Sequence, residues 1–298
     1  MTTQGIFLTV FGRTVVGKKR SKDEDAFLIT DLSGGSPLGA MKSAVSLQSN
    51  ERGILIAVSD GMGGAEAGDV ASTLVLSALG MKMTTAQASS PEQGLRHSIE
   101  EANQQVFNTA QSTGRVGMGA TLTAVLFHDL FAYTAEIGDS RAYLMRDNRM
   151  VQLTRDQSYV QTLIDMGAIT AEEAKTSDFK NVIVQAMGLG PKIEVALRRI
   201  SIRAHDRFLV CSDGLCGTLK DQDMLSLMLG NATLESVCTK LIELAVARGA
   251  EDDITVILAE VNGEGAPAVT GSERVTSQAP EAFATTLDAR PSTVPASA

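Results

Sequence analysis

The sequence contains no tryptophan, and aromatic residues make up only 4% of its 298 residues. The hydrophobic residues, 44% of the chain, must therefore build a core mainly from Val, Ile, Leu, Met and Ala, and their share suffices for a sizeable core. No run reaches the roughly 18 apolar residues of a membrane-spanning helix, and residues 1–20 lack the pattern of a signal peptide. We therefore expect a cytoplasmic protein without membrane association.

Cysteine, histidine and positive charge are also scarce. The three cysteines and three histidines lack zinc-type spacing, which excludes a zinc site and predicts reduced, packed thiols. The formal net charge is -9 and the sequence pI is about 4.9, which argues against a broad surface for nucleic acid or anionic lipid. A phosphate-bearing substrate must then be attracted locally, by a cation or a bound metal.

The apolar patterns indicate a mixture of strands and helices. A β-branched run at residues 53–59 predicts a buried strand, and residues 65–83 and 91–111 have helical spacing. Between residues 119 and 154, four strand-like runs are joined by short connections, so successive strands should pair as antiparallel neighbours. Further elements are predicted downstream, with strands at 193–202, 207–211 and 254–261 and helices at 221–229 and 234–248. The pattern is typical of an α+β fold and excludes a simple doubly wound parallel sheet.

Two segments differ from this pattern. Residues 155–190 are more polar and mostly helical in pattern, and their place between two acidic motifs predicts a small flap beside the site. Residues 263–298 are rich in Ala, Pro, Ser and Thr and show little periodicity, which predicts a disordered tail. The remaining residues, 1–262, form the predicted domain.

Five short acidic motifs follow one another along the chain. They are D-E-D at 23–25, S-D-G-M-G-G at 59–64, G-D-S-R at 138–141, S-D-G-L at 212–215 and E-D-D-I-T-V at 251–256. Taken singly, each is more typical of a turn or a solvated charge run. Most of them stand where a strand-like run starts or stops, so a sandwich of strands can bring their oxygens to one rim. Such oxygens are the ligands that Mg²⁺ and Mn²⁺ prefer.

With these motifs in this order, the chain resembles the metal-dependent protein serine/threonine phosphatases of the PP2C type, in their compact bacterial form. The resemblance covers about residues 5–261 and also includes R-S-K-D-E-D, G-A-T-L-T-A, I-G-D-S-R-A-Y-L, L-T-R-D-Q-S and L-V-C-S-D-G-L. It implies a four-layer α-β-β-α sandwich of two antiparallel sheets flanked by helix pairs.

The resemblance also implies a set of metal ligands. They are Glu24, Asp25, Asp60, the Gly61 carbonyl, Asp139, Asp213 and Asp252. Asp60 would bridge two Mn²⁺ or Mg²⁺ ions, with Asp213 and Asp252 on one of them and Glu24 and Gly61 on the other. Asp25 would be a direct ligand or lie just outside the ligands, and Asp139 with Asp213 would hold a possible third ion.

The resemblance gives Arg20, Asp60 and Asp213 catalytic roles. Arg20 would grip the substrate phosphate, because a guanidinium can hold two phosphate oxygens at once. Without the acidic motifs, Arg20 would be read as a surface cation of the K-K-R run at 18–20. The implied reaction is attack on phosphorus by a metal-activated water, without a covalent phosphoenzyme.

Three positions depart from the family pattern. Asp253 stands where the family usually has Asn, which adds negative charge near Asp252. Gln157 stands where a histidine is frequent. Met62 replaces the histidine of eukaryotic members, which leaves protonation of the leaving group to water.

The first functional hypothesis is a phosphatase that hydrolyses phosphoserine and phosphothreonine in proteins and opposes a bacterial Ser/Thr kinase. The alternative is a weakly active regulatory or binding module with the same fold. A third hypothesis keeps the chemistry but acts on small metabolites or on a phosphorylated anti-sigma-antagonist. The absence of coiled-coil heptads and of disulfide spacing makes a monomer the expectation. The substrate, the kinase, the metal used in the cell and the role of the tail stay open.

Overall fold

The computed structural model describes residues 5–62 and 67–268 of the chain. The strands are β1 (Phe7–Val15), β2 (Asp25–Asp31), β3 (Val45–Gln48), β4 (Ile54–Met62), β5 (Gly119–Ala120), β6 (Leu122–His128), β7 (Phe131–Ile137), β8 (Arg141–Arg146), β9 (Arg149–Gln152), β10 (Ala196–Ser201), β11 (Arg207–Cys211) and β12 (Ile254–Asn262). The helices are α1 (Gly68–Thr85), α2 (Pro91–Ser112), α3 (Tyr159–Asp165), α4 (Ala171–Lys175), α5 (Asp213–Cys216), α6 (Asp221–Met228) and α7 (Leu234–Ala247).

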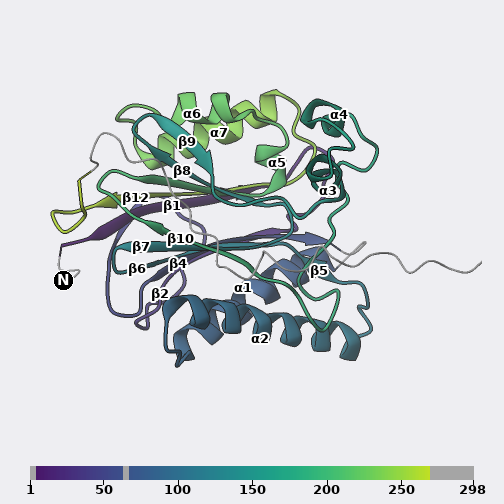
Figure 1. The fold of residues 1–298 in the computed structure, drawn as a ribbon, viewed down its shortest axis with the longest axis horizontal. Helices are drawn as coiled ribbons and strands as arrows, with labels where there is room; N and C mark the ends of the chain where they lie inside the picture. The colour runs from purple at the N-terminus through teal and green to yellow at the C-terminus, as the bar shows by residue number, and fades with distance from the viewer. Residues whose placement is uncertain (1–4, 63–66, 269–298) are drawn as a thin grey trace, which may run out of the picture.

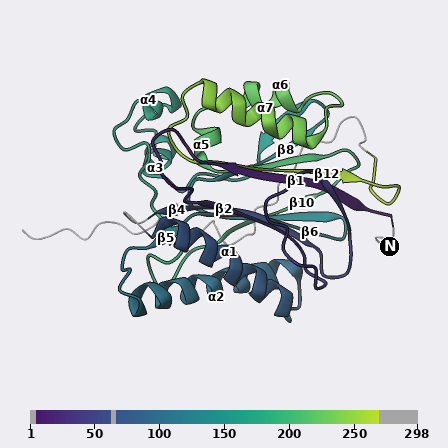
Figure 2. The ribbon, with the colours of Figure 1, turned by 180° about the vertical axis from the view of Figure 1, so that it is seen from behind.

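Two antiparallel sheets stack face to face, and helices cover both outer faces (Figure 1). One sheet has the strand order β3-β1-β12-β11-β8-β9 and carries α6 and α7 on its outer face. The other has the order β10-β7-β6-β4-β2, with β5 paired to β4, and carries α1 and α2, as the opposite view also shows (Figure 2). This arrangement confirms the predicted α+β sandwich of four layers.

Strand β4 shows why the apolar runs lack the alternation of a surface strand. Leu55 and Ala57 face the cluster beneath α1 and α2, whereas Ile56 and Val58 face the cluster between the sheets. Both faces of the strand are therefore buried, which requires apolar residues at every position. Between the sheets, the rings of Phe127 and Phe208 pack edge to face, with their centroids 4.9 Å apart.

The turn at residues 138–140 corrects one detail of the sequence prediction. β7 and β8 are not neighbours, because β7 pairs with β6 and β10, whereas β8 pairs with β9 and β11. Gly138 has a φ of 102°, a conformation that favours glycine, and a Cβ there would come within 2.7 Å of Thr121. The turn thus carries the chain from one sheet to the other, and Asp139 lies at the rim between them.

The segment at 155–190 contains two short helices, α3 and α4, and is otherwise irregular. The predicted capping box is confirmed, since the Glu173 N–H donates to the Thr170 hydroxyl at 3.2 Å and the Thr170 N–H donates to the Glu173 carboxylate at 2.7 Å. Although its composition is more polar than that of the flanking segments, this segment exposes several large apolar side chains. They are Tyr159, Met166, Phe179, Val182, Val184 and Leu189.

The predicted tail begins inside the described residues. Ala266 is buried, and the Pro267 carbonyl accepts a hydrogen bond from the Ala204 N–H at 2.9 Å, so the start of this segment packs on the domain. The rest of the predicted tail, from residue 269, lies outside the described residues, as does the G-G-A-E stretch at 63–66. In the parts of the chain that are described, no helix has the length and apolarity needed to cross a membrane.

Candidate metal centre

The acidic motifs meet at one rim of the sandwich. Asp60 lies in β4 directly opposite Asp25 of β2. Asp139 follows β7, Asp213 is the first residue of α5 after β11, and Asp252 precedes β12. These strand ends gather at the side where β5, α3 and α5 lie (Figure 1). Motifs that are far apart along the chain are therefore close together in the folded protein.

The carboxyl groups at this rim repel one another. Burial raises the pKa of Asp60 well above its usual range, and the negative charges of Asp25 and Asp213 raise it further. Burial and the charge of Asp252 raise the pKa of Asp213. Burial, followed by the charge of Asp213, raises the pKa of Asp139 to about 7. A bound cation would relieve this repulsion and favour the ionised carboxylates.

Among the residues that the structure describes, two buried carboxylate oxygens lack a hydrogen-bond partner. They are Oδ1 of Asp25 and Oδ1 of Asp213. The other oxygen of Asp25 accepts a hydrogen bond from the Ser212 hydroxyl at 2.7 Å. Buried polar atoms are normally paired, so two orphaned oxygens in one acidic cluster point to an absent positive partner. This donor chemistry fits a hard divalent cation.

Glycine brings a second set of oxygens together. The Gly61 N–H donates to the Glu24 carbonyl at 3.1 Å. A Cβ on Gly68 would lie 2.6 Å from Oε1 of Glu24 and 3.0 Å from the Gly61 carbonyl oxygen. The Glu24 carboxylate and the Gly61 carbonyl thus face one small space that only glycine leaves open. This is the pair that the family resemblance implies for the second ion.

Arg20 lies at the exposed edge of the cluster. Its Nε and Nη2 donate to the two oxygens of Asp252 at 2.7 and 2.8 Å, and its Nη1 donates to Glu24 at 2.9 Å. The hydrogen bond to Asp252 raises the pKa of Arg20 above its already high ordinary value. Arg20 is therefore held among the acidic residues and is not a free surface cation of the K-K-R run.

All the predicted site residues lie at this rim. In residues 5–62 and 67–268, no three side chains of His, Cys, Asp or Glu are grouped closely enough to hold one ion between them. Glu24 and Asp252 are paired instead with the Arg20 guanidinium.

Three hydroxyl residues support the acidic cluster and were not predicted to do so. The Thr121 hydroxyl accepts a hydrogen bond from the Asp60 N–H and contacts the Ser140 hydroxyl, both at 2.9 Å. The Ser212 hydroxyl also accepts the Thr255 N–H, at 2.9 Å. Ser140 and Ser212 belong to acidic motifs and Thr121 belongs to the G-A-T-L-T-A motif, and these positions are the sequence signal for them.

The three departures from the family pattern also lie close to the rim. Gln157 accepts the Gly138 N–H at 3.0 Å and donates to the Glu136 carbonyl at 3.3 Å. Asp253 is 2% exposed and accepts two backbone N–H groups. Met62 is the last residue of β4 and pairs with Gly119.

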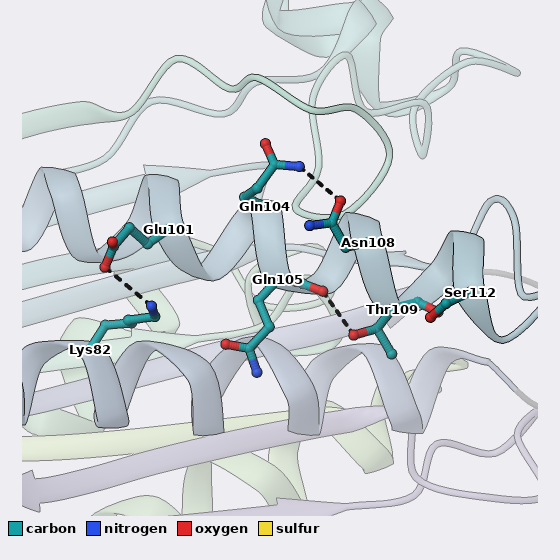
Figure 3. A pocket seen from close by; sticks show the side chains of 7 residues that line it. All are labelled: Lys82, Glu101, Gln104, Gln105, Asn108, Thr109 and Ser112. Atoms are coloured by element: carbon teal, nitrogen blue, oxygen red, sulfur yellow. Dashed lines mark hydrogen bonds and ion pairs between the residues drawn. The ribbon is translucent and has the colours of Figure 1, made fainter.

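A separate groove runs along α1 and α2, with a volume of about 520 Å³ (Figure 3). Its polar groups bind one another, as in the Lys82–Glu101 ion pair at 3.4 Å and the hydrogen bond from Gln104 to Asn108 at 3.0 Å. None of the acidic residues of the rim lines it.

The sequence is similar to those of known phosphatases. The family described as protein phosphatase 2C matches residues 43–259. The serine/threonine protein phosphatase PstP of Mycobacterium tuberculosis is 38% identical over 208 residues, which cover 70% of this chain and 40% of that protein. The serine/threonine phosphatase stp of Listeria welshimeri is 37% identical over 213 residues, covering 70% of this chain and 84% of that protein.

The fold is similar to solved structures of such proteins. The catalytic domain of PstP in complex with two manganese ions matches with a TM-score of 0.71 and 33% identity, over 86% of this chain and 99% of that one. Stp1 from Staphylococcus aureus matches with a TM-score of 0.74 and 31% identity, over 84% and 94% of the two chains. The chain belongs to the protein phosphatase 2C family, as its motifs indicate. It spans about 40% of the length of the Mycobacterium relatives that it matches.

Proposed function

We propose that this protein is a metal-dependent phosphatase that removes phosphate from phosphoserine and phosphothreonine in other proteins. The observation that carries the proposal is the buried acidic cluster around Asp60, with orphaned oxygens on Asp25 and Asp213 and with Arg20 at its exposed edge. Acidic oxygens of this kind suit divalent cations, and a guanidinium beside them suits a phosphate. The family membership supports the same reaction.

The proposed ligands divide into two groups of oxygens. Asp213 and Asp252 would complete the coordination of one Mn²⁺ or Mg²⁺ ion, and Glu24 and the Gly61 carbonyl that of the other, with Asp60 shared. Asp25, held by Ser212, lies beside them. The PstP structure holds two manganese ions, which supports the number and leaves the choice between Mn²⁺ and Mg²⁺ to experiment. A third ion at Asp139 and Asp213 is part of the proposal.

Hydrolysis breaks the bond between phosphorus and the serine or threonine oxygen and forms one between phosphorus and a water oxygen. Bound divalent ions supply an acidified water and offset the negative charge on phosphate. Arg20 binds phosphate oxygens and orients the phosphorus toward the acidic cluster. Met62 cannot donate a proton, so the departing alkoxide takes its proton from water.

The substrates in this proposal are phosphorylated proteins, and the opposing enzyme is a cognate bacterial Ser/Thr kinase. The similarity to serine/threonine phosphatases of Mycobacterium tuberculosis and Listeria welshimeri supports phosphorylated proteins as substrates. The kinase, a monomeric state and a cytoplasmic location stay predictions from the sequence.

The test combines Mn²⁺ titration calorimetry with turnover of a phosphothreonine peptide. Wild type should bind two Mn²⁺ ions and hydrolyse the peptide. Asp60→Asn should lose at least one ion and about 100-fold or more of the turnover, because it removes the shared ligand. Asp221→Asn, on the exposed first turn of α6, is the matched control and should behave as wild type.

Two other outcomes would contradict the proposal. Capture of the phosphopeptide without turnover in folded, metal-loaded protein would favour the regulatory or binding module. Turnover of small phosphorylated metabolites, with phosphoserine and phosphothreonine peptides untouched, would establish the metabolite phosphatase instead.

A further inference from the structure

A buried carboxylate beside the proposed metal ligands binds no cation and no side chain among the described residues. Asp253 is 2% exposed, and each of its oxygens accepts a backbone N–H. Oδ1 accepts the N–H of Gly17 and Oδ2 accepts that of Glu24, both at 2.8 Å. These two N–H groups mark the two ends of the loop at residues 17–24. Asp253 therefore fastens both ends of this loop with a single side chain.

This loop carries two of the residues to which the proposed function gives a role. Arg20 lies within it, and Glu24 ends it. The Arg20 N–H donates to the Gly17 carbonyl at 3.1 Å, which closes a turn inside the loop. The position of the Arg20 guanidinium thus depends on the position of Gly17, and Gly17 is held by Asp253.

The loop is also fitted closely onto residues 251–253. A Cβ on Gly17 would come within 2.2 Å of the backbone of Asp252, so the two backbones are in contact. The Lys19 N–H donates to the Glu251 carbonyl at 3.0 Å. On the other side, the Asp253 N–H donates to Oδ1 of Asp252 at 2.9 Å. Asp253 therefore contacts the backbone of the loop that carries Arg20 and Glu24, and it also contacts the side chain of Asp252.

We propose that Asp253 is a positioning residue that sets the 17–24 loop so that Arg20 and Glu24 stand beside Asp252. Its catalytic consequence rests on the proposed phosphatase function. A carboxylate can accept both N–H groups, whereas an amide has one acceptor oxygen and would turn an NH₂ group toward the other N–H. The Asp at this position, where the family usually has Asn, is thus matched to its two donors.

The test compares Asp253→Ala and Asp253→Asn with Asp206→Asn. Asp206 is a buried carboxylate at the opposite end of β11, where it pairs with Arg146 and accepts the Arg203 N–H at 2.8 Å. Its substitution lowers stability without touching the loop. Three quantities are measured for each variant: KM and kcat on a phosphothreonine peptide, hydrogen exchange of residues 17–24, and Tm.

Asp253→Ala should raise the KM about tenfold, because a displaced Arg20 loses the equivalent of one charge-assisted hydrogen bond to the phosphate. Asp253→Asn keeps one acceptor and should give a smaller rise. In both variants, the amides of residues 17–24 should exchange faster while those of β4 stay protected. Asp206→Asn should lower Tm and leave both the KM and the exchange of the loop unchanged.

The proposal is overturned if Asp253→Ala and Asp253→Asn change only Tm, with KM and the exchange of the loop as in wild type. Failure of the phosphatase function looks different. Wild type would then turn over no phosphopeptide with any metal, whereas faster exchange confined to residues 17–24 in the Asp253 variants would still support the positioning role. If Asp253→Ala does not fold, Asp253→Asn decides.

Discussion

Arg20 contacts two proposed metal ligands with one side chain. Its bidentate contact with Asp252 and its third donor on Glu24 need a planar fork of N–H groups. A lysine ammonium has the same charge but cannot reach two carboxylates in this geometry. The identity of the residue therefore matters here as much as its charge.

Arg20→Lys should accordingly raise the KM for a phosphothreonine peptide by about tenfold or more, because one charge-assisted contact of about 1.5–3 kcal/mol is lost. Initial-rate kinetics at saturating Mn²⁺ would measure this change in KM. Arg13→Lys, on an exposed residue of β1, is the control for the general effect of this exchange. An unchanged KM in Arg20→Lys would show that the guanidinium geometry of Arg20 is not needed to hold the phosphate.

Among the elements, the turn between β7 and β8 connects the acidic rim to the flap. The Gly138 carbonyl accepts the Gln157 N–H at 2.8 Å, and the Gly138 N–H donates to the Gln157 side chain. The same side-chain oxygen accepts Nε2 of Gln185 at 3.0 Å, and the Gln157 carbonyl accepts the Val184 N–H. One residue thus ties both ends of the flap to the turn that carries Asp139.

Gln157→Ala should loosen the flap while the sandwich stays intact. Proteolysis within residues 155–190 should become several-fold faster, because opening of a segment increases as its hydrogen bonds are removed. Limited proteolysis followed by mass spectrometry would locate the cuts. Gln161→Ala, which removes only an exposed contact with Asp165 inside the flap, should leave the cleavage rate near that of wild type. Equal cleavage rates of the two variants would show that the Gln157 side chain does not hold the flap against the turn at residues 138–140.

For the whole molecule, the sandwich concentrates carboxyl groups at one end. Burial raises the pKa of Glu136, three residues before Asp139, to about 8. Folding therefore keeps a proton on Glu136 that the unfolded chain releases near its ordinary pKa of 4.5. The free energy of unfolding then falls as pH rises from the ordinary value toward about 8.

Glu136→Gln should flatten this pH dependence, because the amide carries no titratable proton. Between about pH 5 and pH 8.5, Tm of the variant should fall less than that of wild type. Glu100→Gln, on the exposed face of α2, is the control and should keep the wild-type slope. Identical slopes in wild type and Glu136→Gln would mean that Glu136 is not the protonated group.

Removal of divalent cations should lower the stability of the whole domain. A ligand present at about 100 times its Kd stabilises the folded state by about 2.7 kcal/mol, which corresponds to roughly 5–10 °C in Tm for a domain of this size. Thermal unfolding with chelator and with Mn²⁺ would measure this difference. In Asp60→Asn the difference should shrink. A Tm independent of Mn²⁺ in wild type would argue against a metal within the acidic rim.

Much of this architecture could be predicted from the sequence, because the acidic residues stand at the ends of apolar runs and strand ends gather at one rim. The sequence does not predict that residues 138–140 connect one sheet to the other. A Gly-Asp-Ser turn has the same sequence pattern whether it joins two paired strands or two strands of different sheets. The contact between Ser212 and Asp25 joins residues 187 positions apart, and no local pattern reports such a pair. For the same reason, the sequence does not predict the hydrogen bonds from the Gly17 and Glu24 N–H groups to Asp253.

The most direct test of the central claim is the initial rate on a phosphothreonine peptide with chelator, with Mg²⁺ and with Mn²⁺, for wild type beside Asp213→Asn. Asp213 has an orphaned buried oxygen, and Asn keeps its shape while removing its charge. We predict turnover that requires a divalent cation and that falls about 100-fold or more in the variant. Metal-independent turnover, or a variant as active as wild type, would contradict the account.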